Sequence, residues 1–252
     1  EDNRINQDLA REALTRAGLV VQVADHGEQA LRILDKETFF AVLMDLRMPV
    51  MDGLDAIKHI RANRALRDVP VIALSAGVLK QEVEQALACG FDYYLSKPID
   101  FDKLLRLLNQ IGGFADHGVL PVAIPSSLPP DIGGIQFGRA LRNHGHDTAL
   151  LKRLMLEFIR IYEDGDNQMG SLLAAGDLTA AERLAHNIAG VSGSFGAMKL
   201  MAAARAIEHQ LVAGTPVEAP LLSALSAELL NFVSAIRQFD SDTTDPRAAR
   251  AG

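Results

Sequence analysis

The chain has 252 residues, of which 48% are hydrophobic and 23% charged, and its formal net charge is -7. This composition excludes an intrinsically disordered chain, and the length suits one large domain or two ordinary ones. The acidic balance, with no concentrated basic stripe, argues against a nucleic-acid-binding surface. The single cysteine, Cys89, excludes an intrachain disulfide framework and favours a reducing compartment. We find no uninterrupted apolar run near the roughly 20 residues that span a bilayer, so we expect a cytoplasmic chain.

The first part of the chain alternates between helical and strand patterns. Helices are expected over residues 4–17, 28–36, 52–64, 81–88 and 100–110, and strands over residues 19–24, 39–45, 70–74 and 91–95. Strands separated by helices of this length form parallel βαβ units with right-handed crossovers. Ligands bind beyond the carboxyl ends of such strands. We therefore expect Asp45, Ser75 and Lys97, each at or just past a strand end, to meet in one pocket.

The second part of the chain is expected to be entirely helical. A stretch over residues 113–133 contains four prolines with glycine and serine between them, which predicts an interdomain linker. Beyond it, we expect a long helix capped by Asp147 and further helices from about residue 178, over 197–212 and over 220–239. These form a predicted four-helix bundle over residues 134–240, followed by a polar tail over residues 241–252.

Three acidic residues are candidates for one cation site. Glu1 and Asp2 would lie beside Asp45 if they end a neighbouring strand. Carboxylates about 4 Å apart repel by ~4 kcal/mol at an effective dielectric of 20, so such a cluster indicates a divalent cation, and oxygen ligands favour Mg²⁺. Mg²⁺ bridges phosphoryl oxygens, which points to Asp45 as a nucleophile that forms an acyl phosphate, assisted by Lys97 and the Ser75 hydroxyl. Taken singly, each residue is better interpreted as a surface acid or a capping serine, but their shared position at strand ends favours the phosphoryl site.

Four motifs occur in the order and spacing of one known domain. They are EDNRINQ at the start, MDLRMPVMDG around Asp45, ALSA around Ser75, and YYLSKP, which ends at Pro98. Residues 1–112 therefore closely resemble a response-regulator receiver domain, an α/β flavodoxin-like (CheY-like) fold. The resemblance implies that Asp45 is the phosphoacceptor, that Ser75 is the switch hydroxyl and that Lys97 contacts the phosphate.

The same resemblance implies further roles. Glu1, Asp2 and Asp45 would bind Mg²⁺ together with the backbone carbonyl of Arg47. Tyr94 would be the aromatic residue whose rotamer follows phosphorylation, with a half-buried packing residue as the alternative, and the bond after Lys97 would be cis.

The sequence departs from the receiver pattern at its start. Receiver domains carry a central apolar strand just before the acidic pair, and here the chain opens on Glu1 without an initiator Met. We therefore expect a receiver that lacks its first strand and is unstable as it stands, and a longer parent protein.

His186 is the second candidate acceptor. Gly190 and Gly193 follow it on the same helix face, and each glycine inside a helix costs ~1 kcal/mol relative to Ala. Counting Gly196, three such residues indicate close packing or clearance for a partner. A lone His is ordinarily a core or surface residue, but HNIAGVSGSFGA resembles the His-containing phosphotransfer (HPt) motif. By that resemblance, His186 accepts phosphate from a receiver aspartate.

The HPt motif is imperfect here. Family members usually carry Lys three residues after the histidine, where this chain has Ala189. Arg183, three residues before His186, is a candidate replacement, with a solvated surface charge as the alternative. His144, His146 and Asp147 could bind a metal, although we interpret them as a loop and a helix N-cap.

An aspartate and a histidine acceptor on one chain favour a phosphorelay. The favoured interpretation is the C-terminal part of a hybrid sensor histidine kinase, in which phosphate passes from an upstream phosphohistidine to Asp45, then to His186 and a response regulator. The expected partners are a kinase core, in the same parent, and that regulator. We expect no nucleic acid and no direct membrane contact, although the parent could be anchored in the inner membrane. No ATP-binding glycine motif occurs, so we expect no kinase activity in this chain itself. The alternatives are a stand-alone receiver–HPt relay or phosphate sink, and a scaffold with an inactive HPt domain.

Overall fold

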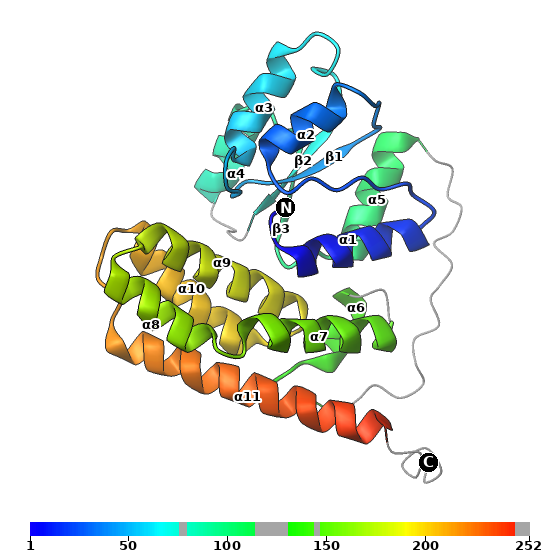
Figure 1. The fold of residues 1–252 in the computed structure, drawn as a ribbon. Coiled ribbons are helices and arrows are strands. Elements are labelled where there is room, and N and C mark those ends of the chain that lie inside the picture. The colour runs from blue at the N-terminus through cyan, green and yellow to red at the C-terminus, as the bar shows by residue number, and fades with distance from the viewer. Residues whose placement is uncertain (76–79, 114–130, 144–146, 245–252) are drawn as a thin grey trace. The chain divides into compact units, whose positions relative to one another are not determined.

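The computed structural model describes residues 1–75, 80–113, 131–143 and 147–244 (Figure 1). The chain divides into two compact units, Glu1–Val122 and Ala123–Gly252. His144 and His146 lie outside the described residues, whereas Asp147 caps the following helix through a 2.9 Å hydrogen bond from Leu150 N.

The first unit is a parallel three-stranded sheet between helices. Its elements are α1 (Arg4–Arg16), α2 (Gly27–Leu34), β1 (Val42–Asp45), α3 (Gly53–Ala62), β2 (Val71–Ser75), α4 (Lys80–Ala88), β3 (Tyr93–Ser96) and α5 (Phe101–Gly112). The strand order is β1-β2-β3, and all pairs are parallel. Figure 1 shows α1 and α5 on one side of the sheet and α2, α3 and α4 on the other. Asp45 and Ser75 are the last residues of neighbouring parallel strands, so both lie at the carboxyl end of the sheet.

Apolar side chains fix the helices against both faces of this sheet. On one face, Ile57 and Ile60 of α3 pack with Met44 and Val71 in a buried cluster. Four helices of this unit begin where a side chain accepts a backbone N–H of the first turn, namely Asn3 for α1, His26 for α2, Asp52 for α3 and Asp100 for α5. Such caps satisfy donors that the helix itself leaves unpaired.

The predicted strand over residues 19–24 is wrong: these residues form no strand, although all of them are described. An apolar cavity of about 180 Å³ lies between this segment and β1, lined by Val21, Val23, Leu43 and Leu108 among others. A segment forms a strand only where a neighbouring strand completes its ladder of hydrogen bonds. Residues 19–24 have no such neighbour, because the cavity lies where a strand between them and β1 would be. The expectation of a receiver sheet without its first strand is confirmed, and β1 is an edge strand of the described sheet.

The second unit is a helical bundle. Its helices are α6 (Phe137–Asn143), α7 (Thr148–Tyr162), α8 (Gly165–Ala175), α9 (Leu178–Ser194), α10 (Met198–Val212) and α11 (Ala219–Thr244). Helix α9 packs along α10, and α11 packs against α7, α8 and α10. Phe158, Phe195 and Phe232 form an aromatic centre with ring centroids 4.9 to 6.1 Å apart. The sequence analysis missed α6, which has only seven residues, and α8, which buries only Gly165 and Met169.

Helix α11 is long and apolar enough over Ala219–Asp240 to cross a membrane, judged by length and composition. Here it is a bundle helix, because Leu225, Leu229, Phe232 and Ile236 are buried in the second unit. The sequence shows no uninterrupted apolar run here, because polar residues occur at intervals along the helix.

Gly196 lies after the end of α9 and not inside it, which corrects the count of three glycines within the helix. Its φ of 71° is in the left-handed region, and an added Cβ would lie 2.6 Å from the Gln136 carbonyl oxygen. A turn that close to another backbone requires glycine.

Candidate functional site

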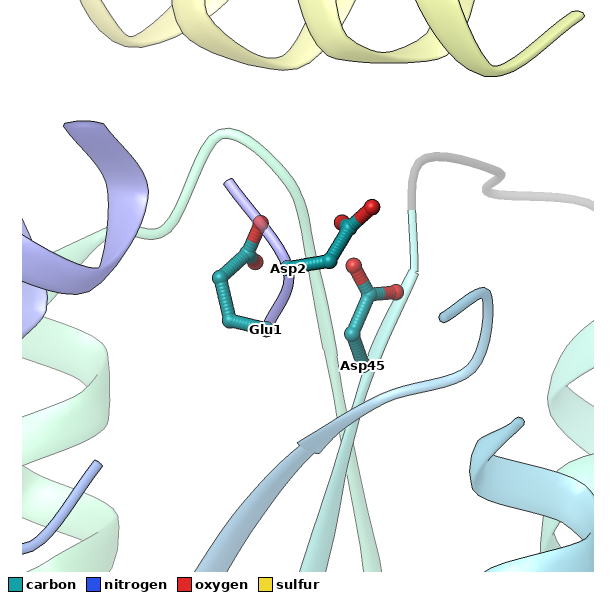
Figure 2. Close-up of side chains that lie close together, drawn as sticks. All are labelled: Glu1, Asp2 and Asp45. Atoms are coloured by element: carbon teal, nitrogen blue, oxygen red, sulfur yellow. The ribbon is translucent and has the colours of Figure 1, made fainter. Parts of the chain in front are cut away.

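An acidic cluster stands at the carboxyl end of the sheet. Asp45 is the last residue of β1 and is only 1% exposed, while Glu1 and Asp2 lie just before α1. Figure 2 shows the three side chains gathered at one place. One carboxylate oxygen from each residue lies within 4.8 Å of the others. Among the residues that the structure describes, this is the one group of His, Cys, Asp and Glu with the proximity needed for a metal ion.

Lys97 is the cation of this cluster. It follows β3, and its ammonium donates to Glu1 Oε2 at 2.5 Å and to Asp45 Oδ2. Burial alone lowers the pKa of this lysine, but the charges of Asp45 and Glu1 and their hydrogen bonds outweigh burial and raise it. Lys97 therefore remains charged, and its positive charge offsets part of the repulsion among the carboxylates.

The other predicted receiver residues surround Asp45. Ser75 is buried at the end of β2, and the Lys97 amide donates to its carbonyl at 2.7 Å. The Arg47 amide donates to Asp45 Oδ1 at 3.1 Å. The Lys97–Pro98 bond is cis, as expected. Tyr94 is half-buried and packs against the hydrophobic cluster beneath α2, α3 and α4.

Two residues of α1 that the sequence analysis did not single out hold Glu1 in place. Asn6 donates its side-chain amide to Glu1 Oε1 at 3.0 Å, and Gln7 donates to the Glu1 carbonyl at 2.5 Å. Both residues belong to the opening motif EDNRINQ. Their place in the first turn of the helix that follows Glu1 was the feature of the sequence that could have indicated a contact with Glu1. They align the first carboxylate with the other two.

His186 lies on α9 and is paired with a residue of α10. Its Nδ1 lies 2.8 Å from Glu208 Oε1, and the two side chains are 9% and 3% exposed. The sequence analysis missed Glu208. The available signal was a single acid on the apolar stripe of α10 that contains Ala204, Ile207 and Leu211.

The remaining residues of the histidine motif are distributed around α9. Gly190 and Gly193 are buried, Ala189 is buried, and Arg183 is exposed. The guanidinium of Arg183 thus lies on the solvent side of the helix that carries His186.

Two family models match this chain. The model described as response regulator receiver domain matches residues 1–109, and the model described as Hpt domain matches residues 153–239. The chain therefore contains one domain of each family. Its first unit contains a receiver domain and its second unit an Hpt domain, and together they form a phosphorelay module.

Similar proteins match different shares of this chain. "Signal transduction histidine-protein kinase BarA" of Shigella flexneri is 28% identical over 221 residues, which are 86% of this chain and 24% of BarA. An "uncharacterized 14.6 kDa protein in sodA1 3'region" of Leptolyngbya boryana is 36% identical and matches 44% of this chain and 84% of that protein. The chain thus spans less than a quarter of the length of BarA.

Among solved structures, the receiver domain of sensor histidine kinase PA1611 from Pseudomonas aeruginosa is similar over 44% of this chain and 93% of that one. The identity is 40% and the TM-score is 0.42. That structure has a magnesium ion coordinated in its active site cleft.

Proposed function

We propose that Asp45 of the receiver domain accepts a phosphoryl group and that His186 of the Hpt domain takes it on. One observation carries the proposal: the buried Asp45 carboxylate shares the Lys97 ammonium with Glu1 at the carboxyl end of the parallel strands. A carboxylate held at this edge, beside a buried cation, is a fixed nucleophile with a charge partner for an incoming phosphate.

The acidic cluster fits a magnesium ion. Carboxylate oxygens within 4.8 Å of one another are hard ligands at a spacing that one cation can bridge. Glu1, Asp2, Asp45 and the Arg47 carbonyl would hold the ion, which supplies positive charge to the phosphoryl oxygens when bound.

In the first step, an Asp45 Oδ atom attacks the phosphorus atom from the side opposite the donor nitrogen, in line with the N–P bond that breaks. The new Oδ–P bond forms as the donor's N–P bond breaks, and that electron pair returns to the donor nitrogen. Lys97 then exchanges a carboxylate contact for a phosphoryl oxygen, while the Ser75 hydroxyl donates to another. Tyr94 follows the new position of Ser75 as the switch residue.

In the second step, His186 Nε2 attacks the same phosphorus. The Nε2–P bond forms, the Oδ–P bond breaks, and Asp45 is again a carboxylate. We place this module at the C-terminal end of a hybrid sensor histidine kinase, in the cytoplasm, with a kinase core as the phosphate source and a response regulator as the acceptor.

A second candidate function is favoured by Ala189, which stands where Hpt domains usually have a lysine. Without that cation, the bundle could be a scaffold that binds partners and carries no phosphate. A stand-alone relay or phosphate sink keeps the same chemistry with a separate kinase.

The experiment is to incubate the chain with Mg²⁺ and a small acyl phosphate donor and to map phosphate by mass. Matched variants are Asp45→Asn and His186→Gln. We expect phosphate on both residues in the unmodified chain, on Asp45 alone in His186→Gln, and on neither acceptor in Asp45→Asn. Phosphate confined to Asp45 in the unmodified chain would favour the scaffold, and no phosphate on Asp45 would remove the proposal.

A further inference from the structure

A phosphoryl group on His186 brings negative charge to a buried part of the bundle. A phosphoryl group on a protein side chain carries on the order of -1.5 to -2 charge at pH 7, together with three strong acceptor oxygens. Because His186 is buried, water screens this charge poorly. A cation beside the acceptor nitrogen would stabilise the phosphorylated ring and the transition state that leads to it.

The helices around His186 carry few cations. Helix α8 has no Lys, Arg or His. The cationic and imidazole side chains on α9 and α10, besides His186 itself, are Arg183, Lys199, Arg205 and His209. Three of these are exposed, whereas Arg205 is half-buried and its Nε atom is buried. Arg205 is therefore the cation of this hairpin that lies at the packed boundary and not in bulk solvent.

The register of α9 and α10 places Arg205 beside the acceptor. The short connection over residues 195–197 makes the two helices antiparallel neighbours, and they pack along their length (Figure 1). The contact of His186 with Glu208 sets their register. Arg205 is three residues before Glu208 on α10, and Ala189 is three residues after His186 on α9, so Arg205 lies opposite Ala189. Residues three apart share a helix face, so Arg205 and Glu208 lie on the same face of α10.

The stretch of α9 opposite Arg205 has little side-chain volume. It contains Ala189 and Gly190, and Gly193 follows one turn later on the face that carries His186. A long side chain at one of these positions would compete with Arg205 for the same space. The small residues leave the guanidinium room on the side of α9 that carries the acceptor.

We infer that Arg205 is a catalytic residue of the relay, whose guanidinium binds the phosphoryl group while His186 holds it. This inference rests on the proposed function of His186, and it assigns to α10 the cation that α9 lacks at Ala189. A guanidinium donates to two phosphoryl oxygens at once. As the Nε2–P bond forms, the Oδ–P bond breaks and its electron pair returns to Asp45. Arg205 forms no bond to phosphorus and keeps its protons throughout.

The test measures transfer onto His186 separately from the loading of Asp45. Full chains carrying His186→Gln are phosphorylated on Asp45 with a small acyl phosphate donor and then freed of the donor. They are mixed with full chains carrying Asp45→Asn, which keep His186 as the acceptor. The initial rate of labelling of His186 is followed by mass for acceptors with Arg205, Arg205→Gln and Arg205→Lys. The matched control is Lys199→Gln, which removes an exposed positive charge from the same helix.

We expect Arg205→Gln to lower the transfer rate by about 10- to 100-fold, as for the loss of one charge-assisted hydrogen-bonded contact. Arg205→Lys is expected to lose less, because it keeps the charge but not the planar fork. Lys199→Gln is expected to leave the rate unchanged. Equal rates for Arg205→Gln and the unmodified acceptor would overturn the inference. A loss in Arg183→Gln with none in Arg205→Gln would overturn it in favour of Arg183.

A second measurement distinguishes a contact with phosphate from a role in packing alone. Full chains carrying Asp45→Asn are phosphorylated on His186 with phosphoramidate, which phosphorylates histidine directly, and the phosphorus NMR signal is followed against pH. A neighbouring guanidinium stabilises the more negative form of the phosphoryl group. We therefore expect Arg205→Gln to raise the pKa of that phosphoryl group and Arg205→Lys to keep it near the value in the chain with Arg205.

The two measurements together separate this inference from the function on which it rests. If His186 is labelled but neither the transfer rate nor the pKa of the phosphoryl group responds to Arg205→Gln, the inference alone is wrong. If His186 of the chain with Arg205 is labelled by neither donor, the proposed function is wrong and the inference with it.

Discussion

Lys97 is the residue on which the geometry of the receiver site depends, because it is a buried cation bonded to two carboxylates. Removing one member of such a group leaves an uncompensated buried charge, which costs far more than a surface ion pair contributes. The chemistry of the site and the stability of its surroundings therefore rest on the same contacts.

Val50 is a strained residue in the loop after Asp45. Its φ of 66° is in the left-handed region, which costs a β-branched residue roughly 1–2 kcal/mol, and the residue is 78% exposed. Asparagine adopts this conformation more readily. We expect Val50→Asn to raise the unfolding free energy of the first unit by about 1 kcal/mol, measured by urea titration with hydrogen exchange.

Val20 provides the control for this change. Val20 is a valine that is 94% exposed, so the same substitution there also changes a surface side chain. It does not share the strained backbone, because among the described residues other than glycine only Val50 has a positive φ. Val20→Asn is expected to change stability by less than about 0.5 kcal/mol. Equal stability of the two variants would show that Val50 is not strained.

At the scale of helices and strands, the sequence predicts those features that depend on neighbouring residues alone, such as helix caps and the ends of strands. Helices α3 and α5 begin where Asp52 and Asp100 cap them, and Asp45, Ser75 and Lys97 were placed at strand ends by periodicity. The segment over residues 19–24 has a strand-like pattern but no pairing partner, and pairing is a tertiary property. Glu208 was missed for a similar reason, because its importance depends on the helix that packs against it.

Two glycines test how closely the elements approach one another. An added Cβ on Gly53 of α3 would lie 2.2 Å from the carbonyl oxygen of Asp45, whereas one on Gly170 of α8 would meet nothing within 4 Å. We expect Gly53→Ala to destabilise the first unit by about 1–3 kcal/mol, despite the better helix propensity of alanine. Gly170→Ala is expected to stabilise the second unit by about 1 kcal/mol.

Hydrogen exchange followed by mass spectrometry reads the two units separately. Protection should fall around α3 in the first variant and rise around α8 in the second. Stabilisation by Gly53→Ala would contradict the close approach of α3 to the end of β1.

At the scale of the whole molecule, each unit carries one acceptor and its own core. The receiver core lies between the sheet and its helices, and the Hpt core centres on the aromatic group of Phe158, Phe195 and Phe232. The order of the two domains was predictable because each carries a motif that is local in sequence. We propose that phosphate passes from the acceptor of the first unit to that of the second.

The most direct test is a time course of phosphate on Asp45 and His186 after a brief exposure to an acyl phosphate donor. Donor is removed once Asp45 is labelled, and both sites are then quantified by mass. We predict that phosphate on Asp45 falls as phosphate on His186 rises, and that His186 stays unlabelled in Asp45→Asn. Labelling of His186 at the same rate in Asp45→Asn would contradict the relay.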